Sequence, residues 1–190
     1  MKFTLFLCSI VFSAGISSAT AIYDGKDIVR IREESQPTHF CNPKRRREAV
    51  SLLRALNPET IDHFMTTDRS EWREAIDKRG YKEEAPQGFV FDEEEPDTVP
   101  LYRLYNEDDH DHFYTTSRKE RSKAVQELGF SFEGITGYIY ESEICGSIPL
   151  YRMYNAKATD HFYTSSKEER DSAAQAGWDP EGIEGYVFPA

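Results

Sequence analysis

One segment of this chain occurs three times. Residues 101–117 return almost unchanged at residues 150–166, and a weaker copy lies at residues 52–68. Equivalent positions in the copies are 49 residues apart, as the arginines at Arg54, Arg103 and Arg152 show. A fixed period of this length predicts one supersecondary unit that is built three times.

Each copy predicts the same short series of elements. In the second copy, residues 101–116 are rich in aromatic side chains around a polar turn, which predicts a β-hairpin. Ser117 and Glu120 form a capping box, which predicts a helix over about residues 118–128. Residues 130–140 predict a further strand region. We expect the helix to bury three apolar side chains: Ala124, Val125 and Leu128.

These elements predict a β-dominated α+β fold with one short helix per repeat. We place the repeats at about residues 50–98, 99–147 and 148–190, within a single repeat domain of residues 49–190. Because no unit can bury its apolar face alone, we expect closure around a pseudo-threefold axis. A trefoil-like barrel and a three-bladed propeller both fit four short strands per unit, and the sequence leaves the two open.

The first residues have the pattern of a secretory signal. Lys2 precedes a short apolar run, and Ala19-Thr20-Ala21 has the small residues of a cleavage site. We therefore predict a signal peptide over residues 1–21 and a secreted, extracellular protein. No later segment is long and apolar enough to predict a membrane span.

Residues 22–48 show no clear period and predict an irregular N-terminal segment. It contains the basic run from Lys44 to Arg47. This run is either a site for a processing protease or part of a helix that begins at Asn42-Pro43. The helix start is favoured. If Cys41 pairs with Cys145, cleavage after the basic run would leave the upstream segment bound to the rest of the protein through the disulfide.

The mature chain retains two cysteines, Cys41 and Cys145, once Cys8 leaves with the signal peptide. In an oxidising compartment an even pair predicts one disulfide. It would close a loop of about 105 residues and contribute about 4 kcal/mol in the chain-entropy model. Two free or intermolecular thiols are the alternative.

The chain is acidic, with 23 basic and 34 acidic residues and a net charge of -11. Nucleic-acid binding needs a positive surface, so this balance argues against it. Two acidic runs, at residues 92–95 and 107–109, lack the glycine and the ligand spacing of a calcium loop. No zinc pattern exists, and we predict no metal site and no cofactor.

Several motifs follow one another in a fixed order across about residues 50–189. They are Pro-Leu-Tyr-Arg-Leu-Tyr-Asn, Asp-His-Phe-Tyr-Thr-Thr-Ser and Glu-Gly-Ile-x-Gly-Tyr. In these motifs the chain resembles a secreted repeat domain of unknown function from bacteria and fungi, which can accompany cell-wall amidases and glycoside hydrolases. The resemblance implies an accessory, lectin-like module without known catalysis. The first copy departs from the pattern, with Leu53, Leu56 and Met65 in place of tyrosines.

In each copy an aspartate directly precedes a histidine. A carboxylate beside an imidazole suggests a general base, but neighbours on a strand point to opposite faces and cannot readily form a dyad. We predict a structural role, in which Arg103 pairs with Asp111 across the hairpin and His112 makes a buried hydrogen bond. Ligand binding by this set is the alternative. The structural set is Arg54, Asp62, His63, Arg103, Asp111, His112, Arg152, Asp160 and His161.

The candidates for ligand binding are tyrosines and glutamates that we assign only to the second and third copies, together with the asparagines beside the tyrosines. Tyrosine rings beside asparagines and carboxylates offer stacking for the C–H face of a sugar and hydrogen bonds for its hydroxyls. The alternative is that the tyrosines belong to the core, with their hydroxyls at the rim. The candidates are Tyr102, Tyr105, Asn106, Tyr114 and Glu133 in the second copy, and Tyr151, Tyr154, Asn155, Tyr163 and Glu181 in the third.

Our main functional hypothesis is a secreted, non-catalytic module that binds an extracellular or cell-wall glycan. The alternative is an extracellular structural or interaction protein, of a matrix or a host interface, which uses its acidic surface to meet a protein partner. A small secreted hydrolase has the least support, since no nucleophile and no pair of catalytic carboxylates can be identified. We therefore expect no enzymatic activity.

Overall fold

The computed structural model describes residue 41 and residues 43–190. The predicted signal peptide, residues 1–21, lies outside the described residues, as does most of the segment predicted to be irregular. Within that segment, Pro43–Glu48 forms a helix, α1, in agreement with the favoured prediction of a helix start at Asn42-Pro43. The basic run therefore lies in a helix that is followed at once by a strand, β1 (Val50–Ser51).

The series strand, strand, helix, strand occurs three times. Repeat 1 contains β2 (Leu53–Asn57), β3 (Asp62–Thr66), α2 (Arg69–Lys78) and β4 (Lys82–Glu83); repeat 2 contains β6 (Thr98–Asn106), β7 (Asp111–Thr115), α3 (Arg118–Glu127) and β8 (Ser131–Tyr140); repeat 3 contains β9 (Ile148–Asn155), β10 (Asp160–Thr164), α4 (Lys167–Gln175) and β11 (Asp179–Val187). A short strand, β5 (Phe89–Val90), pairs with β1. The predicted β-dominated α+β fold, with a short helix in each repeat, is confirmed.

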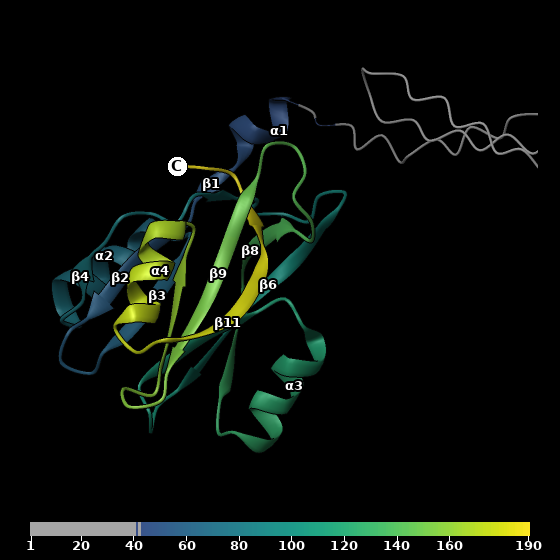
Figure 1. Cartoon of the computed structure of the whole chain (residues 1–190). Helices are drawn as coiled ribbons and strands as arrows, with labels where there is room; N and C mark the ends of the chain where they lie inside the picture. The colour runs from purple at the N-terminus through teal and green to yellow at the C-terminus, as the bar shows by residue number, and fades with distance from the viewer. Residues whose placement is uncertain (1–40, 42) are drawn as a thin grey trace, which may run out of the picture. The chain divides into compact units, whose positions relative to one another are not determined.

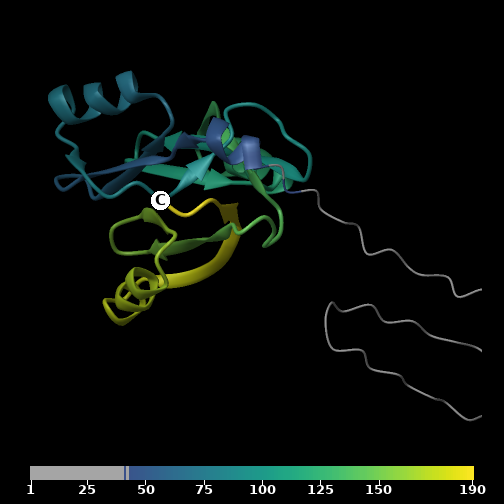
Figure 2. The ribbon, with the colours of Figure 1, turned by 90° about the horizontal axis from the view of Figure 1, so that it is seen from above.

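Backbone pairing arranges these strands in three sheets. The largest has the order β10-β9-β11-β8-β6-β7, and the others are β3-β2-β4 and β1-β5. In Figure 1 the long strands of the largest sheet curl into part of a barrel. Figure 2 shows α2 (blue-teal) and α4 (yellow-green) on the outside, on either side of the strands. The pairing within the described residues shows neither a closed barrel nor three propeller blades.

Helix α3 shows how far the local pattern predicts an element. Ser117 accepts a hydrogen bond from the backbone N–H of Glu120 at 3.2 Å, so the helix begins at the predicted cap. Ala124 is buried, but Val125 and Leu128 are 43% and 53% exposed, so their predicted burial was wrong. A short helix on the outside of a sheet buries only a narrow stripe of its surface.

The main apolar core draws equally on the three repeats. Its side chains form three sets, and each set takes one residue from the equivalent position of each repeat. Because a repeat supplies only three of these side chains, none of the repeats can form this core by itself. The sets are Leu52, Leu101 and Leu150; Met65, Tyr114 and Tyr163; and Val90, Ile139 and Val187.

A second apolar cluster contains an aromatic triangle. The rings of Phe91, Tyr140 and Phe188 pack edge to face, and each pair of ring centroids is 5.6 Å apart. Beside them, Phe89 and Phe188 exchange two backbone hydrogen bonds, of 2.9 and 3.0 Å. Gly88 permits this close approach, because a Cβ there would clash with the carbonyl oxygen of Phe188.

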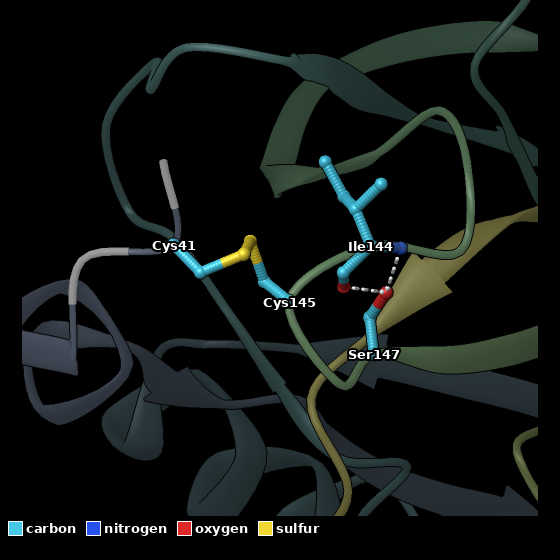
Figure 3. The surroundings of a disulfide bond; sticks show 4 residues. All are labelled: Cys41, Ile144, Cys145 and Ser147. Carbon is cyan, nitrogen blue, oxygen red and sulfur yellow. Dashed lines mark hydrogen bonds between the residues drawn. A yellow bond between two sulfur atoms is a disulfide. The ribbon is translucent and has the colours of Figure 1, made fainter. Parts of the chain in front are cut away.

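The predicted disulfide joins Cys41 to Cys145, with an S–S distance of 2.11 Å and a Cα–Cα distance of 5.2 Å. Figure 3 shows Ser147 next to this bridge, holding the loop that carries Cys145. The Ser147 hydroxyl donates to the carbonyl oxygen of Ile144 at 2.7 Å and accepts from its N–H at 3.2 Å. The disulfide therefore joins Cys41, which precedes α1, to the connector between repeats 2 and 3.

Candidate functional site

The aspartate–histidine pairs form between repeats rather than within them. His63 Nδ1 lies 2.6 Å from Asp160 Oδ2, and the backbone N–H of His63 donates to Asp160 Oδ1 at 3.0 Å. Repeat 1 thus contacts repeat 3 in this way, repeat 2 contacts repeat 1, and repeat 3 contacts repeat 2. The other two pairs are His112 with Asp62 and His161 with Asp111, each with an Nδ1–Oδ2 distance of 2.7 Å.

An arginine completes each of these polar clusters. The terminal nitrogens of Arg103 donate to Glu71, in α2 of the preceding repeat, at 2.9 and 2.8 Å. Its Nε lies 2.8 Å from a carboxylate oxygen of Glu133. The predicted pairing of Arg103 with Asp111 was wrong, because Asp111 accepts from His161 and the guanidinium reaches the neighbouring repeat instead.

Equivalent contacts surround the other two arginines. They are Arg54 with Glu169 and Glu84, and Arg152 with Glu120, Glu181 and Glu184. The sequence predicted that the capping-box glutamates bond back to the start of their own helix. They bind arginines of a neighbouring repeat instead. Thr115 takes that role in α3, since its hydroxyl accepts from the backbone N–H of Ser117 at 3.0 Å and donates to Glu120.

The ion pairs shift the pKa values of their members. Burial tends to raise the pKa of Glu71, but hydrogen bonds from Arg103 and Thr66 outweigh it and hold the pKa below its usual value. The same balance lowers the pKa values of Glu120 and Glu169. Burial tends to lower the pKa of Arg103, and the bond to Glu71 raises it above its usual value. These three glutamates are therefore charged at neutral pH, and their ion pairs hold neighbouring repeats together.

Two of the predicted ligand-binding tyrosines lie in the core. Tyr114 and Tyr163 are both 0% exposed, and burial raises the pKa of both hydroxyls. The Tyr114 hydroxyl donates to the carbonyl oxygen of Met65 at 2.7 Å and accepts from its N–H at 2.6 Å. The Tyr163 hydroxyl does the same with the backbone of Tyr114. Their predicted contact with a ligand is corrected, because neither ring reaches the surface.

Repeat 1 lacks this tyrosine, and an arginine replaces one of its bonds. Met65 occupies the equivalent position and has no hydroxyl. Arg54 Nη1 instead donates to the carbonyl oxygen of Tyr163 at 2.9 Å. The backbone of β10 is therefore bonded across the core even though the third hydroxyl is missing.

The predicted ligand-binding asparagines hold the hairpin turns. Asn106 Oδ1 accepts from the backbone N–H of Asp108 at 3.0 Å, and Asn155 Oδ1 accepts from that of Lys157 at 3.0 Å. Repeat 1 makes the same turn with Asn57. These are Asx turns, in which the side chain replaces a backbone acceptor.

The predicted ligand-binding glutamates are paired with arginines. Glu133 and Glu181 each place a carboxylate oxygen 2.8 Å from the Nε of the arginine in their own repeat. In repeat 1, Glu84 lies 2.7 Å from Arg54 Nε. The premise that repeat 1 lacks this glutamate was therefore wrong, and all three belong to the polar clusters.

Tyr105 and Tyr154 lie at the rim of the clusters. Both rings are half-buried and pack against the imidazoles of His112 and His161, with ring centroids 4.5 and 4.6 Å apart. The Tyr105 hydroxyl lies 3.2 Å from His110 Nδ1 at the surface. One face of each tyrosine therefore covers a histidine.

Tyr151 lies in an open groove of about 340 Å³ between α4 and strands β9 and β11. The guanidinium carbon of Arg170 lies 4.5 Å from the centroid of this ring. Arg170 Nε donates to Asp171 Oδ1 at 2.8 Å. Pro180 and Ile183 also line the groove, and Ile183 is 47% exposed. The groove thus combines an aromatic ring, an apolar wall and an exposed ion pair.

The equivalent place in repeat 2 is filled. Phe132 stands where repeat 3 has Pro180, and its ring packs against Tyr102 with centroids 6.0 Å apart. The guanidinium carbon of Arg121 lies 4.7 Å from the Tyr102 centroid. Tyr102 is therefore only 3% exposed. In repeat 1, Trp72 of α2 is at the position of Arg121, and its indole N–H donates to a backbone carbonyl of β2 at 3.3 Å.

Among residue 41 and residues 43–190, no group of three or more His, Cys, Asp or Glu side chains is arranged to hold a metal ion. No helix in the same part of the chain is long and apolar enough to cross a membrane. The sequence interpretation missed that the arginines bind the capping-box glutamates. Their signal was present, since Glu71, Glu120 and Glu169 recur with the same 49-residue spacing as the arginines.

Neither a curated protein nor a solved structure matches this chain. A family model described as a domain of unknown function, DUF5648, matches residues 51–188. The match begins at β1 and ends just after β11, so it covers all three repeats and the polar clusters between them. The chain therefore belongs to the DUF5648 family of domains of unknown function.

Proposed function

We propose that the protein is a secreted, non-catalytic binding module whose ligand is a carbohydrate of an extracellular or cell-wall glycan. The observation that carries this proposal is the groove at Tyr151. It is open in repeat 3, whereas Phe132 packs against the equivalent tyrosine in repeat 2. An unfilled position among equivalent ones is where a ligand would be expected.

The chemistry of the groove suits a sugar. Its volume of about 340 Å³ lies within the usual range for ligand pockets. The Tyr151 ring offers a face to the C–H bonds of a pyranose, and Ile183 extends the apolar wall. Arg170 and Asp171 offer donors and acceptors to hydroxyl groups. Because their ion pair is at the surface, it stabilises the fold little, and a ligand can compete with it at low cost.

The binding module we propose has its three repeats closed around a pseudo-threefold axis. Strands β3, β7 and β10 each contact the other two, and the histidine–aspartate pairs link the repeats in one direction around a cycle. The apolar core is built from sets of three equivalent residues. These features support closure through side chains. Contacts between side chains would join the three repeats where backbone pairing between the sheets does not.

Three observations support a role without catalysis. The histidines His63, His112 and His161 each direct Nδ1 to an aspartate of another repeat, and their side chains are only 8%, 10% and 13% exposed. The cluster glutamates are bound by arginines. The same polar cluster also forms at each of the three contacts between repeats, which fits a structural role better than an active centre.

Secretion is supported by the signal pattern at residues 1–21 and by the disulfide. A disulfide between Cys41 and Cys145 requires an oxidising compartment to form and persist. The expected test is expression of the full chain in a secreting host. Recovery in the medium with Ile22 at the N-terminus would support secretion, and retention inside the cell with Met1 intact would argue against it.

The carbohydrate proposal is tested on a glycan array with the secreted protein. We expect binding to a defined group of glycans, and Tyr151→Ala should weaken it about tenfold or more through the lost stacking. Arg121→Ala is the control, because Arg121 is the equivalent of Arg170 and lies in the filled place of repeat 2. Equal binding by wild type and Tyr151→Ala, or no binding to any glycan, would overturn the proposal.

A second candidate function is supported by exposed apolar side chains in repeat 2. Four large ones are exposed on α3, its C-cap and β8, and exposed apolar side chains can meet a protein partner. An extracellular interaction protein is therefore the alternative. It would be favoured if the array shows no glycan binding and Phe132→Ser abolishes retention of a defined extracellular partner. The four are Val125, Leu128, Phe132 and Ile135.

A further inference from the structure

The residue before the close-approach glycine differs between the repeats. It is Gln87 in repeat 1, Thr136 in repeat 2 and Glu184 in repeat 3. The two long side chains bond to a backbone N–H of a neighbouring repeat. Gln87 Oε1 accepts from Ser165 at 2.9 Å, and Glu184 Oε2 accepts from Thr116 at 3.2 Å. Repeats 1 and 3 thus supply their own acceptor at this place.

Thr136 is too short to do the same. The equivalent backbone N–H belongs to Thr67. The Thr67 hydroxyl donates a hydrogen bond to the carbonyl oxygen of Thr136 at 2.9 Å. Thr136 is 8% exposed, and its own hydroxyl is buried without a hydrogen-bond partner among the described residues. A hollow of about 170 Å³ lies here, lined by both threonines.

The occupied position in repeat 3 shows which groups the hollow offers. There, Glu184 Oε1 lies 2.7 Å from Arg152 Nη1, while Oε2 accepts from the backbone of Thr116. The equivalents of these two partners are Arg103 and Thr67, and both line the hollow. A planar group with an acceptor oxygen therefore has a ready set of donors between repeats 1 and 2.

We infer that this hollow is a binding site for the amide group of a ligand, which would take the place that Gln87 and Glu184 fill in the other repeats. The carbonyl oxygen of the amide accepts from the Thr67 N–H and lies beside the Arg103 guanidinium. Ile135, which is 45% exposed at the edge of the hollow, packs against the acyl carbon chain.

A neutral group fits this place better than a carboxylate. Arg103 is already paired with Glu71 and Glu133, so a carboxylate here would be the third negative charge around one guanidinium. Repeat 1 also uses a neutral amide at the equivalent place. In repeat 3, burial and the nearby Glu120 raise the pKa of Glu184 above its usual value, although Arg152 opposes them.

The hollow shares no lining residue with the Tyr151 groove, so it is a second site, and for a glycan ligand its chemistry selects a sugar that carries an acetamido group. That step rests on the proposed function, whereas the vacant position between repeats 1 and 2 does not. The two are separated by variants of Thr136 in the full-length protein. Thr136→Gln supplies the missing side chain, and Thr136→Val removes the hydroxyl without filling the hollow.

The first measurement is thermal unfolding without a ligand. Thr136→Gln should raise the melting temperature by about 2 to 4 °C, because its amide oxygen would bond the Thr67 N–H. Thr136→Val should raise it by less, because it loses the unpaired hydroxyl but gains no bond to the Thr67 N–H. A Thr136→Gln variant no more stable than Thr136→Val would overturn the assignment of a vacant acceptor position.

The second measurement is calorimetric binding of three probes: a β-1,4-linked trisaccharide of N-acetylglucosamine, the glucose trisaccharide of the same linkage, and glucuronate. We expect the N-acetylated probe to bind most tightly and to lose about tenfold in affinity with Thr136→Gln. Tighter binding of glucuronate, or unchanged binding of the N-acetylated probe by Thr136→Gln, would overturn the amide assignment. If no probe binds while Thr136→Gln is stabilised, the acetamido ligand is overturned and the vacancy is supported.

Discussion

Tyr114→Phe removes one hydroxyl from the centre of the fold and deprives two backbone groups of their partner. The hydroxyl accepts from the Met65 N–H at 2.6 Å and donates to its carbonyl oxygen at 2.7 Å. Both residues are 0% exposed. An unsatisfied buried backbone group costs about 1 to 3 kcal/mol, so the loss of both bonds should lower the free energy of unfolding by about 2 to 6 kcal/mol. That is a large part of the about 5 to 15 kcal/mol that stabilises a typical domain.

Denaturant unfolding of the full-length protein with its disulfide intact measures this loss, and Trp72 and Trp178 provide the fluorescence signal. Tyr105→Phe is the control, because its hydroxyl lies at the surface near His110. The control should change stability by no more than about 0.5 kcal/mol. If Tyr114→Phe were as stable as this control, the reasoning that one hydroxyl joins repeats 1 and 2 would be refuted.

The remaining predictions concern the disulfide, the close backbone approach and one buried carboxyl. Cys41→Ser with Cys145→Ser should lower the free energy of unfolding by about 4 kcal/mol, because the bridge spans 104 residues; an unchanged denaturation midpoint would contradict this. Gly88→Ala should cost about 2 kcal/mol or more in thermal unfolding, since its Cβ clashes with the Phe188 carbonyl, and a neutral effect would mean that the two backbones can separate freely. Glu184→Gln should stabilise the protein at pH 7. Its raised folded pKa means that the wild type loses stability as the pH rises above about 4, so the gain should grow with pH, and a gain independent of pH would exclude this cause.

Local elements could be predicted because their causes lie within a few residues. The cap at Ser117 and the helix that follows it depend on hydrogen bonds between near neighbours, and both occur where the sequence placed them. The aromatic strands were found for the same reason. The burial of Tyr114 was not predicted, because alternation along a strand shows that two faces exist without showing which one meets the core.

The polar clusters illustrate the opposite case. The sequence identified Arg103, Asp111 and His112 as structural, but it paired the arginine within its own hairpin. The actual partner, Glu71, lies in the preceding repeat, 32 positions away. The shared 49-residue spacing marks the arginine and the glutamate as repeated features, but it does not show that they meet, because the pair forms only when two separate units pack together.

The sequence alone predicted the repeat, the order of elements in each unit and a disulfide between the two remaining cysteines. These follow from periodicity, local hydrogen bonding and residue counts. The tertiary structure decided which histidine meets which aspartate, which tyrosines are enclosed, and where a groove and a hollow stay open. Those outcomes depend on how the sizes of side chains from separate elements match. Phe132 covers a tyrosine in repeat 2, whereas Pro180 leaves the equivalent tyrosine of repeat 3 open. Gln87 is long enough to bond the next repeat, whereas Thr136 is too short.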